Sequence, residues 1–194
     1  VTAAYRLGWT VLLLLPVVLL RCRAELRRVT ARDLVLCGAS GVLLALHFLT
    51  WFESLKRTSV ASSTVLVSTE VIFTALGFAL FLHGKIPRLG VWAILLAFGG
   101  SALLALSGGG GAGELSGNLL ALAAASAAAV YTLIGRIQRG HLSTTVYTFL
   151  TYLACFLTLL LGTAAAGTPL TGYGGREWLI GLALAVLCTL LGHS

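Results

Sequence analysis

Residues 52–106 read FESLKRTSVASSTVLVSTEVIFTALGFALFLHGKIPRLGVWAILLAFGGSALLAL. Two long apolar runs, at about residues 59–82 and 89–106, flank a short basic turn from His83 to Arg88. At about 1.5 Å per residue, each run is long enough to cross a bilayer as a helix. Glu70 lies near the middle of the first run, and no other acidic residue of the chain falls inside an apolar run. Because a charge at bilayer depth is costly, Glu70 is predicted to have a function.

The composition of the whole chain indicates a membrane protein. Hydrophobic residues make up 58% and charged residues 10% of the chain, and the mean hydropathy is +1.00. A soluble domain carries about 25% charged residues. The formal net charge of +7 would fit a nucleic-acid partner, but the basic residues lie in short loops between apolar runs. We therefore expect the lipid bilayer, and no nucleic acid, as a partner.

Seven apolar runs predict seven membrane spans, all of them helical because a barrel would need shorter, alternating strands. The predicted spans lie at about residues 3–20, 34–52, 59–82, 89–106, 117–133, 145–161 and 178–194. The expected fold class is therefore an all-α integral membrane protein, a multi-span helical bundle. A glycine run at residues 107–113 separates the fourth span from the fifth and predicts a flexible connection.

The charges of the loops predict the orientation of the spans. Alternate loops form two sets, and the set richer in basic residues is expected in the cytoplasm. The richer set contains Arg21, Arg23, Arg27, Arg28, Arg32, Lys85, Arg88, Arg136 and Arg139, and the poorer set contains Arg6, Lys56, Arg57 and Arg176. Val1 is then outside and Ser194 inside. We expect a multi-pass protein of a bacterial plasma membrane.

An approximate internal repeat relates the first two predicted spans to the last two. The repeated pieces are Thr2-Ala3-Ala4-Tyr5 with Thr144-Thr145-Val146-Tyr147, and Arg32-Asp33 with Arg176-Glu177. The copies are five spans apart, an odd number, so they have opposite orientations. Inverted repeats are a common transporter architecture, with the substrate site between them. The chain contains no methionine and both ends lie at spans, so we expect it to be a fragment of a longer membrane protein.

A nine-residue motif surrounds Glu70 and is followed by a turn at Gly84 and a glycine-bearing span. The motif reads Ser68-Thr69-Glu70-Val71-Ile72-Phe73-Thr74-Ala75-Leu76. This pattern resembles the EamA family of the drug/metabolite transporter superfamily, and residues 117–121 with Tyr131 resemble the start of its second repeat. Val71 stands where the family commonly has proline, and Lys85 where it often has glutamate.

The resemblance implies a ten-span protein built from two inverted five-helix repeats. This chain would cover the second to the eighth span, so both repeats would be incomplete. Residues 1–107 would form the first repeat without its first span, and residues 108–116 a glycine-rich connection. Residues 117–194 would form the second repeat without its last two spans.

Small residues recur every four positions on two predicted helices. The stripes contain Ala93, Ala97, Ser101 and Ala105 on one helix, and Gly117, Ala121, Ala125 and Ala129 on the other. Such stripes let helix backbones approach closely in lipid, so we expect tight helix packing at both. A moving contact between the two repeats is the alternative use of the same residues.

Polar side chains concentrate on one face of the second span and one face of the third. The two sets are Ser40, His47, Trp51 and Ser54, and Ser59, Ser63, Glu70 and Thr74, at spacings that place each set near one helical face. We expect a substrate or ion pathway lined by Glu70, His47, Trp51, Ser63, Thr74 and Ser40. The alternatives are hydroxyls bonded to their own helix, an interfacial Trp51 and a His47 that bridges helices.

Signatures of catalysis are absent from the sequence, which has no His-Glu-x-x-His, no Gly-x-Ser-x-Gly and no Walker loop. The four cysteines show no metal spacing. We expect a secondary transporter rather than an enzyme, one that exports small metabolites or drugs by alternating access and needs no cofactor. The alternatives are a nucleotide-sugar or triose-phosphate carrier, an intramembrane enzyme, and a structural membrane subunit. The expected partners are a small-molecule substrate and protons, and a homodimer is compatible with the sequence.

Overall fold

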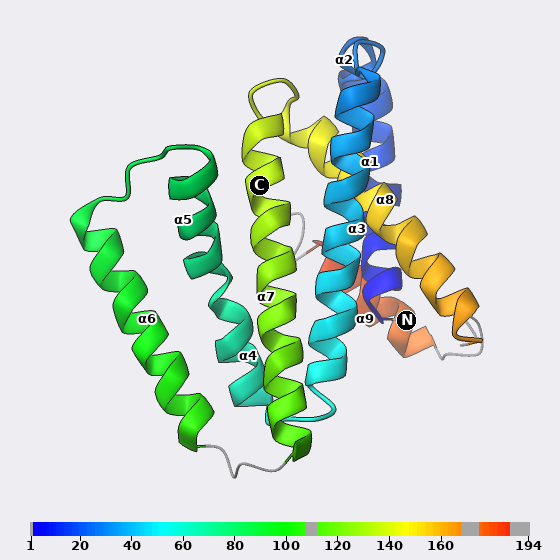
Figure 1. The fold of residues 1–194 in the computed structure, drawn as a ribbon. Helices are drawn as coiled ribbons and strands as arrows, with labels where there is room; N and C mark the ends of the chain where they lie inside the picture. Colours follow the sequence, from blue (N-terminus) through cyan, green and yellow to red (C-terminus); the bar gives the residue numbers. More distant parts are fainter. Residues whose placement is uncertain (1, 108–111, 168–174, 187–194) are drawn as a thin grey trace. The chain divides into compact units, whose positions relative to one another are not determined.

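The computed structural model describes residues 2–107, 112–167 and 175–186, and these residues form helices joined by short turns (Figure 1). The helices are α1 (Thr2–Arg21), α2 (Arg23–Leu26), α3 (Ala31–Ser54), α4 (Val60–Ser68), α5 (Glu70–Phe81), α6 (Arg88–Ser107), α7 (Ala112–Gln138), α8 (Thr144–Ala165) and α9 (Gly175–Ala183). Five helical segments of the described chain are long and apolar enough to cross a membrane. The predicted class, an all-α multi-span membrane protein, is confirmed.

The predicted spans agree with the helices in position but not in every boundary. The seventh predicted span overlaps α9 at its beginning, and residues 187–194 lie outside the described residues. The resemblance predicts that residues 112–116 belong to the glycine-rich connection, but they form the first turn and a half of α7. Alanine and leucine favour a helix there, and Glu114 in the first turn interacts favourably with the positive end of the helix dipole.

The largest difference concerns the third predicted span, which is not one continuous helix. The structure divides it into α4 and α5, with Thr69 between them. The Thr69 N–H and the Thr69 hydroxyl both donate to the carbonyl of Leu66, at 3.1 and 2.6 Å. This three-residue spacing is tighter than the α-helical one, and hydroxyls that bond back to the preceding turn bend helices. The break therefore needs no proline.

Contacts divide the chain into two compact units, each described by itself below. The first unit contains Val1–Ala45 and Ile134–Ser194, and the second contains Leu46–Leu133.

Close backbone approaches hold the first unit together. A Cβ on Gly41 of α3 would lie 2.6 Å from the carbonyl oxygen of Thr151 and 2.8 Å from the nitrogen of Cys155, both on α8. One residue earlier, the Ser40 hydroxyl shares a buried hydrogen bond with the hydroxyl of Tyr147. Glycine at position 41 thus permits a helix crossing that any side chain would obstruct.

The second unit contains the broken span and the helix that follows it. α5 ends at Phe81. Two residues later His83 adopts the left-handed region (φ 50°), and the Gly84 N–H donates to the carbonyl of Phe78 at 3.1 Å. This arrangement closes a helix C-terminus. Pro87 then precedes α6, which packs along both α4 and α5 and returns antiparallel to them (Figure 1).

Candidate functional site

Five of the six predicted pathway residues belong to the second unit. These residues are His47, Trp51, Ser63, Glu70 and Thr74. The sixth, Ser40, lies in the first unit and is fully buried against Tyr147.

Two of the five make buried hydrogen bonds between helices. The Ser63 hydroxyl of α4 accepts a hydrogen bond from Ser54 of α3 at 2.9 Å, and both side chains are fully buried. Nδ1 of His47 lies 3.0 Å from the carbonyl oxygen of Ala124 on α7. Since a carbonyl can only accept, Nδ1 carries the proton in this bond. Both residues therefore join α3 to its neighbours.

Trp51 packs its ring against a small apolar cluster formed by α4 and α7. The cluster contains Leu66, Val67, Ala121 and Ala124. The ring also lies 5.8 Å from the imidazole of His47, centroid to centroid. Its indole nitrogen is buried and has no hydrogen-bond partner among the described residues, which leaves a donor available inside the second unit.

Glu70 is the first residue of α5, directly after the break at Thr69. It is half-buried, and its carboxylate has no hydrogen-bond or ion-pair partner in the part of the chain that the structure describes. One turn later, the Thr74 hydroxyl is buried and likewise unpartnered there. Glu70, Thr74 and Gly77 recur at spacings of four and three residues, so they share one face of α5. Gly77 places that face against Leu133 of α7.

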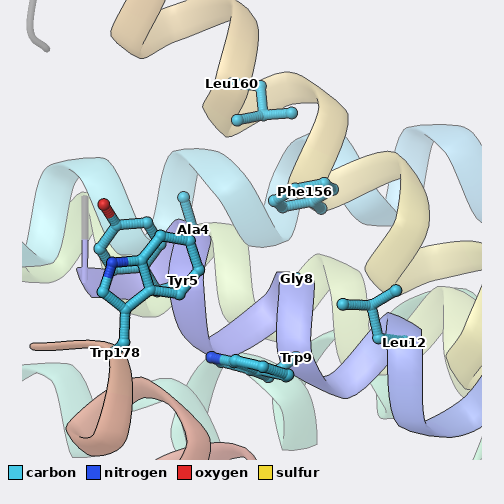
Figure 2. A pocket seen from close by; sticks show the side chains of 8 residues that line it. All are labelled: Ala4, Tyr5, Gly8, Trp9, Leu12, Phe156, Leu160 and Trp178. Carbon is cyan, nitrogen blue, oxygen red and sulfur yellow. The ribbon is translucent and has the colours of Figure 1, made fainter. Parts of the chain in front are cut away.

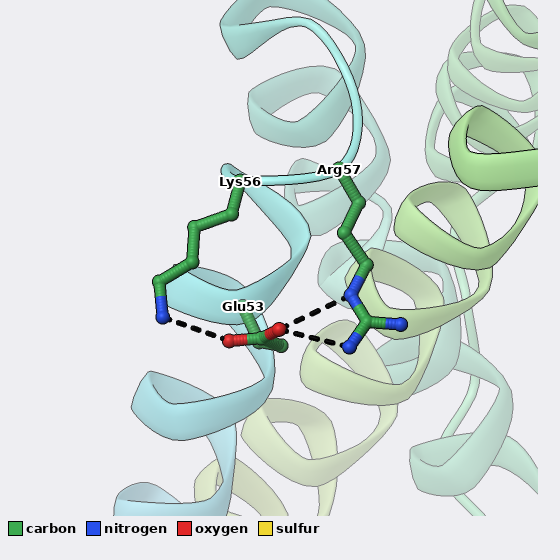
Figure 3. A network of polar contacts seen from close by, with 3 residues as sticks. All are labelled: Glu53, Lys56 and Arg57. Carbon is green, nitrogen blue, oxygen red and sulfur yellow. Dashed lines mark hydrogen bonds and ion pairs between the residues drawn. The ribbon is translucent and has the colours of Figure 1, made fainter.

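Glu53 gives the contrast, because its carboxylate is neutralised. One of its oxygens accepts from Lys56 at 2.9 Å, and the other accepts two bonds from Arg57 at 2.9 and 3.1 Å (Figure 3). Lys56 and Arg57 are exposed and Glu53 is partly exposed at the C-terminal end of α3. The acid at the membrane end thus has two cationic partners, whereas the acid within the span has none among the described residues.

A cavity of about 440 Å³ adjoins the break in the second unit. Its lining residues are Leu66, Thr69, Ile72, Phe73, Leu76, Ile94, Leu95, Phe98, Ser101 and Leu122. The Thr69 hydroxyl donates to the carbonyl of Leu66 on α4, and the Ser101 hydroxyl donates to the carbonyl of Ala97 within α6, so the wall offers an almost wholly apolar surface. Its size suits a small molecule, and Glu70 lies on the adjoining face of α5.

The two small-residue stripes behave differently. On α7, Gly117, Ala121, Ala125 and Ala129 are all buried, and Gly117 lies against Arg57 and Thr58. On α6, Ala93 and Ala97 are exposed, Ser101 is buried, and the side chain of Ala105 lies outside the described residues. The reason is that α6 presents Ile94, Phe98 and Ser101 to the cavity, so the covered face meets the predicted stripe only at Ser101.

Asn118, which the predicted pathway residues do not include, makes contacts between helices. Its side-chain oxygen accepts hydrogen bonds from Thr58 at 2.9 Å and from Ser62 at 3.0 Å. These bonds fix the start of α4 to the start of α7 within the second unit. A lone asparagine in the first turns of an apolar span was the signal that could have revealed it.

The first unit contains a separate aromatic pocket of about 350 Å³ between α1, α8 and α9. Tyr5 and Trp178 stack with ring centroids 4.4 Å apart, and Trp9 meets Trp178 edge-on at 6.3 Å (Figure 2). Phe156 and Leu160 of α8 complete the wall (Figure 2). Within the described ranges, no three His, Cys, Asp or Glu side chains are grouped to hold a metal ion.

The fold and this site define a class of protein, a multi-span helical membrane protein whose broken span carries a carboxylate that has no partner among the described residues. The EamA-like transporter family matches residues 1–106, which is more than half of the chain. The chain therefore belongs to the EamA-like transporter family, and through it to the drug/metabolite transporter superfamily. The resemblance seen in the motif around Glu70 is confirmed. No curated protein and no solved structure matches the chain.

Proposed function

We propose that this chain takes part in exporting small metabolites or drugs by alternating access, and that Glu70 acts through its charge during the transport cycle. Protons are the proposed coupling ion, and a bacterial plasma membrane is the proposed location. Membership of a transporter family supports the general activity. The observation that carries the role of Glu70 is its position, half-buried after a helix break and without a partner among the described residues.

Two physical arguments support this role. Ionisable side chains inside a membrane are expensive, and those that persist are paired or mark substrate, ion or proton pathways. Discontinuous helices are a recurring feature of transporter binding sites. Glu70 combines both features, because it is an ionisable group and it opens the second half of a broken span.

Two buried donors of the second unit add to the support from Glu70. The Thr74 hydroxyl and the Trp51 indole nitrogen are both buried without partners in the described chain. Leaving such groups unpaired costs about 1–3 kcal/mol each, so a polar substrate or water that binds them is favoured. The apolar cavity beside Thr69 offers room for the substrate's apolar part. Together these groups suit a small amphipathic molecule.

The test compares two carboxylate-to-amide changes in the complete gene product, reconstituted in proteoliposomes with an imposed pH gradient. Glu70→Gln keeps the side chain's shape but cannot ionise, and Glu53→Gln is the matched control at an exposed, ion-paired site. Uptake of labelled amino acids and of a cationic dye such as ethidium is followed for each. We expect Glu70→Gln to lose flux or its pH dependence and Glu53→Gln to retain both. Wild-type flux and pH profile in Glu70→Gln, at equal abundance, would reduce Glu70 to a structural role.

A further inference from the structure

A cavity of about 550 Å³ with a polar wall lies at the arginine-rich end of the first unit. It lies where α1 ends, where α3 begins and beside the turn between α7 and α8. Its lining residues are Arg21, Cys22, Ala24, Glu25, Arg28, Thr30, Asp33, His141 and Leu142. We call it the arginine cavity. The transport site described above does not use it.

The two carboxylates in the cavity wall are already engaged by neutral donors. Asp33 accepts from the backbone and hydroxyl of Thr30 at 3.0 and 2.7 Å, and from Gln138 at 3.2 Å. Glu25 accepts from the backbone N–H of Ser143 at 2.6 Å. These bonds fix the wall in place, and they involve no arginine.

The two guanidinium groups in the wall, unlike the carboxylates, are not held by hydrogen bonds to neighbouring residues of the described chain. Arg21 and Arg28 are exposed, and neither side chain has a hydrogen-bond or ion-pair partner in the part of the chain that the structure describes. The charge around them is strongly positive, since seven arginines and two carboxylates leave a formal net charge of +5. The arginines are Arg21, Arg23, Arg27, Arg28, Arg32, Arg136 and Arg139. A forked guanidinium matches the geometry of a phosphate.

Apolar surface begins at the edge of this cavity. Leu19 and Leu20 directly precede Arg21 and are 48% and 83% exposed. Leu34 and Val35 directly follow Asp33 and are 52% and 70% exposed. The cavity therefore lies at the boundary between the apolar helices and their polar ends, which is where lipid phosphates lie in a bilayer. A ligand with both a phosphate and acyl chains fits this arrangement better than a soluble anion.

We propose that the arginine cavity binds the phosphate of an anionic phospholipid through Arg21 and Arg28. The acyl chains lie along the exposed leucine and valine side chains of α1 and α3. Basic pockets between membrane helices are suited to such headgroups. The bound lipid joins the end of α1 to the start of α3 and stabilises the short connection that contains α2.

The test titrates detergent-solubilised protein with phosphatidylglycerol or phosphatidylcholine and measures binding of the first lipid by native mass spectrometry. Arg21→Gln/Arg28→Gln removes two charges from the cavity wall. Arg23→Gln/Arg27→Gln removes two charges from the same connection, at residues that do not line the cavity. Circular dichroism and gel filtration check that both variants fold. If a double variant cannot be purified, the single variants Arg28→Gln and Arg27→Gln are compared in the same way.

We expect Arg21→Gln/Arg28→Gln to weaken phosphatidylglycerol binding about 30-fold. Each arginine near an anionic lipid contributes about fivefold, and the two factors multiply. The control should lose less than about threefold, because its charges act at longer range through screening salt. Phosphatidylcholine binding should not change in either variant. Equal losses in the two double variants would mean that overall charge alone attracts the lipid, and would overturn the proposal. Complete displacement of the lipid by millimolar glycerol phosphate would assign the cavity to a soluble phosphate and would also overturn it.

Discussion

Gly41→Ala tests the packing of the first unit at its closest helix crossing. The added Cβ would lie 2.5 Å from the Cβ of Ala154, 2.6 Å from the Thr151 carbonyl oxygen and 2.8 Å from the Cys155 nitrogen. Two of these atoms are backbone, so no side chain can rotate away. Restoring a contact of 3.4 Å to Ala154 requires α3 and α8 to separate by about 0.9 Å, and a gap of that size forfeits a quarter to a half of each dispersion contact.

The magnitude follows from three contributions. Overpacking in a tight contact costs about 1–3 kcal/mol. The neighbouring bond between Ser40 and Tyr147 is stretched by the same movement, which adds about 1 kcal/mol. Replacing glycine by alanine within a helix returns about 1 kcal/mol of helix propensity. We therefore expect Gly41→Ala to lower the free energy of unfolding by about 1–3 kcal/mol.

The labelling rate of the Cys155 thiol measures this loss, because Cys155 is fully buried on α8 at the crossing. With the other three cysteines replaced by serine, a thiol reagent reaches Cys155 only when the helices open. The rate should rise about 5-fold to 150-fold, the factor that corresponds to 1–3 kcal/mol. The matched control is Gly38→Ala on the same helix, where a Cβ meets no atom within 4 Å. Its labelling rate should be unchanged or lower. Equal rates in wild type and Gly41→Ala would refute the close crossing.

Two further predictions follow from the same contacts and charges. Asn118→Ala leaves the hydroxyls of Thr58 and of the buried Ser62 without their acceptor and should destabilise the protein by about 1–3 kcal/mol. Asn118→Asp keeps an acceptor and should lose less; equal losses in thermal unfolding would show that the shared acceptor is unimportant. In a cysteine-free background, an impermeant thiol reagent added to intact cells should label Lys56→Cys and not Arg27→Cys. The two sites lie beyond opposite ends of α3, and the arginine-rich loops are expected inside the cell. Labelling of Arg27→Cys alone would mean that the predicted orientation is inverted.

The membrane class and the approximate helix positions could be predicted from the sequence because they depend on local composition. Each apolar run must form its hydrogen bonds internally in lipid, so a long run predicts a helix regardless of its neighbours. The break at Thr69 could not be predicted this way. The run from residue 60 to residue 81 contains neither proline nor a central glycine. The break depends on the hydrogen bond from the Thr69 hydroxyl to the carbonyl of Leu66. The hydrophobicity of the run does not predict that hydrogen bond.

The partners of the polar residues were equally inaccessible to sequence reasoning. Helical spacing correctly groups residues on one face, but it does not say what faces them. Ser40 was grouped with His47 and Trp51, yet its hydroxyl bonds to Tyr147, which lies 107 residues further along the chain. On α6 the predicted stripe meets the covered face only at Ser101 among its described members, since regular spacing fixes which residues align but not which face of a helix is covered.

The pairing of α1 with α8 has a consequence for how the protein is made. In the first unit α1 packs against α8, with Gly8 against the ring of Phe156. About 120 residues separate the end of α1 from the start of α8, and at about 5–20 residues per second a ribosome needs roughly 6–25 s to synthesise them. During those seconds α1 is in the membrane without its main neighbour. Its retention there depends on its own hydrophobicity, so a polar substitution on the face that later meets α8 should impair insertion before it can affect packing.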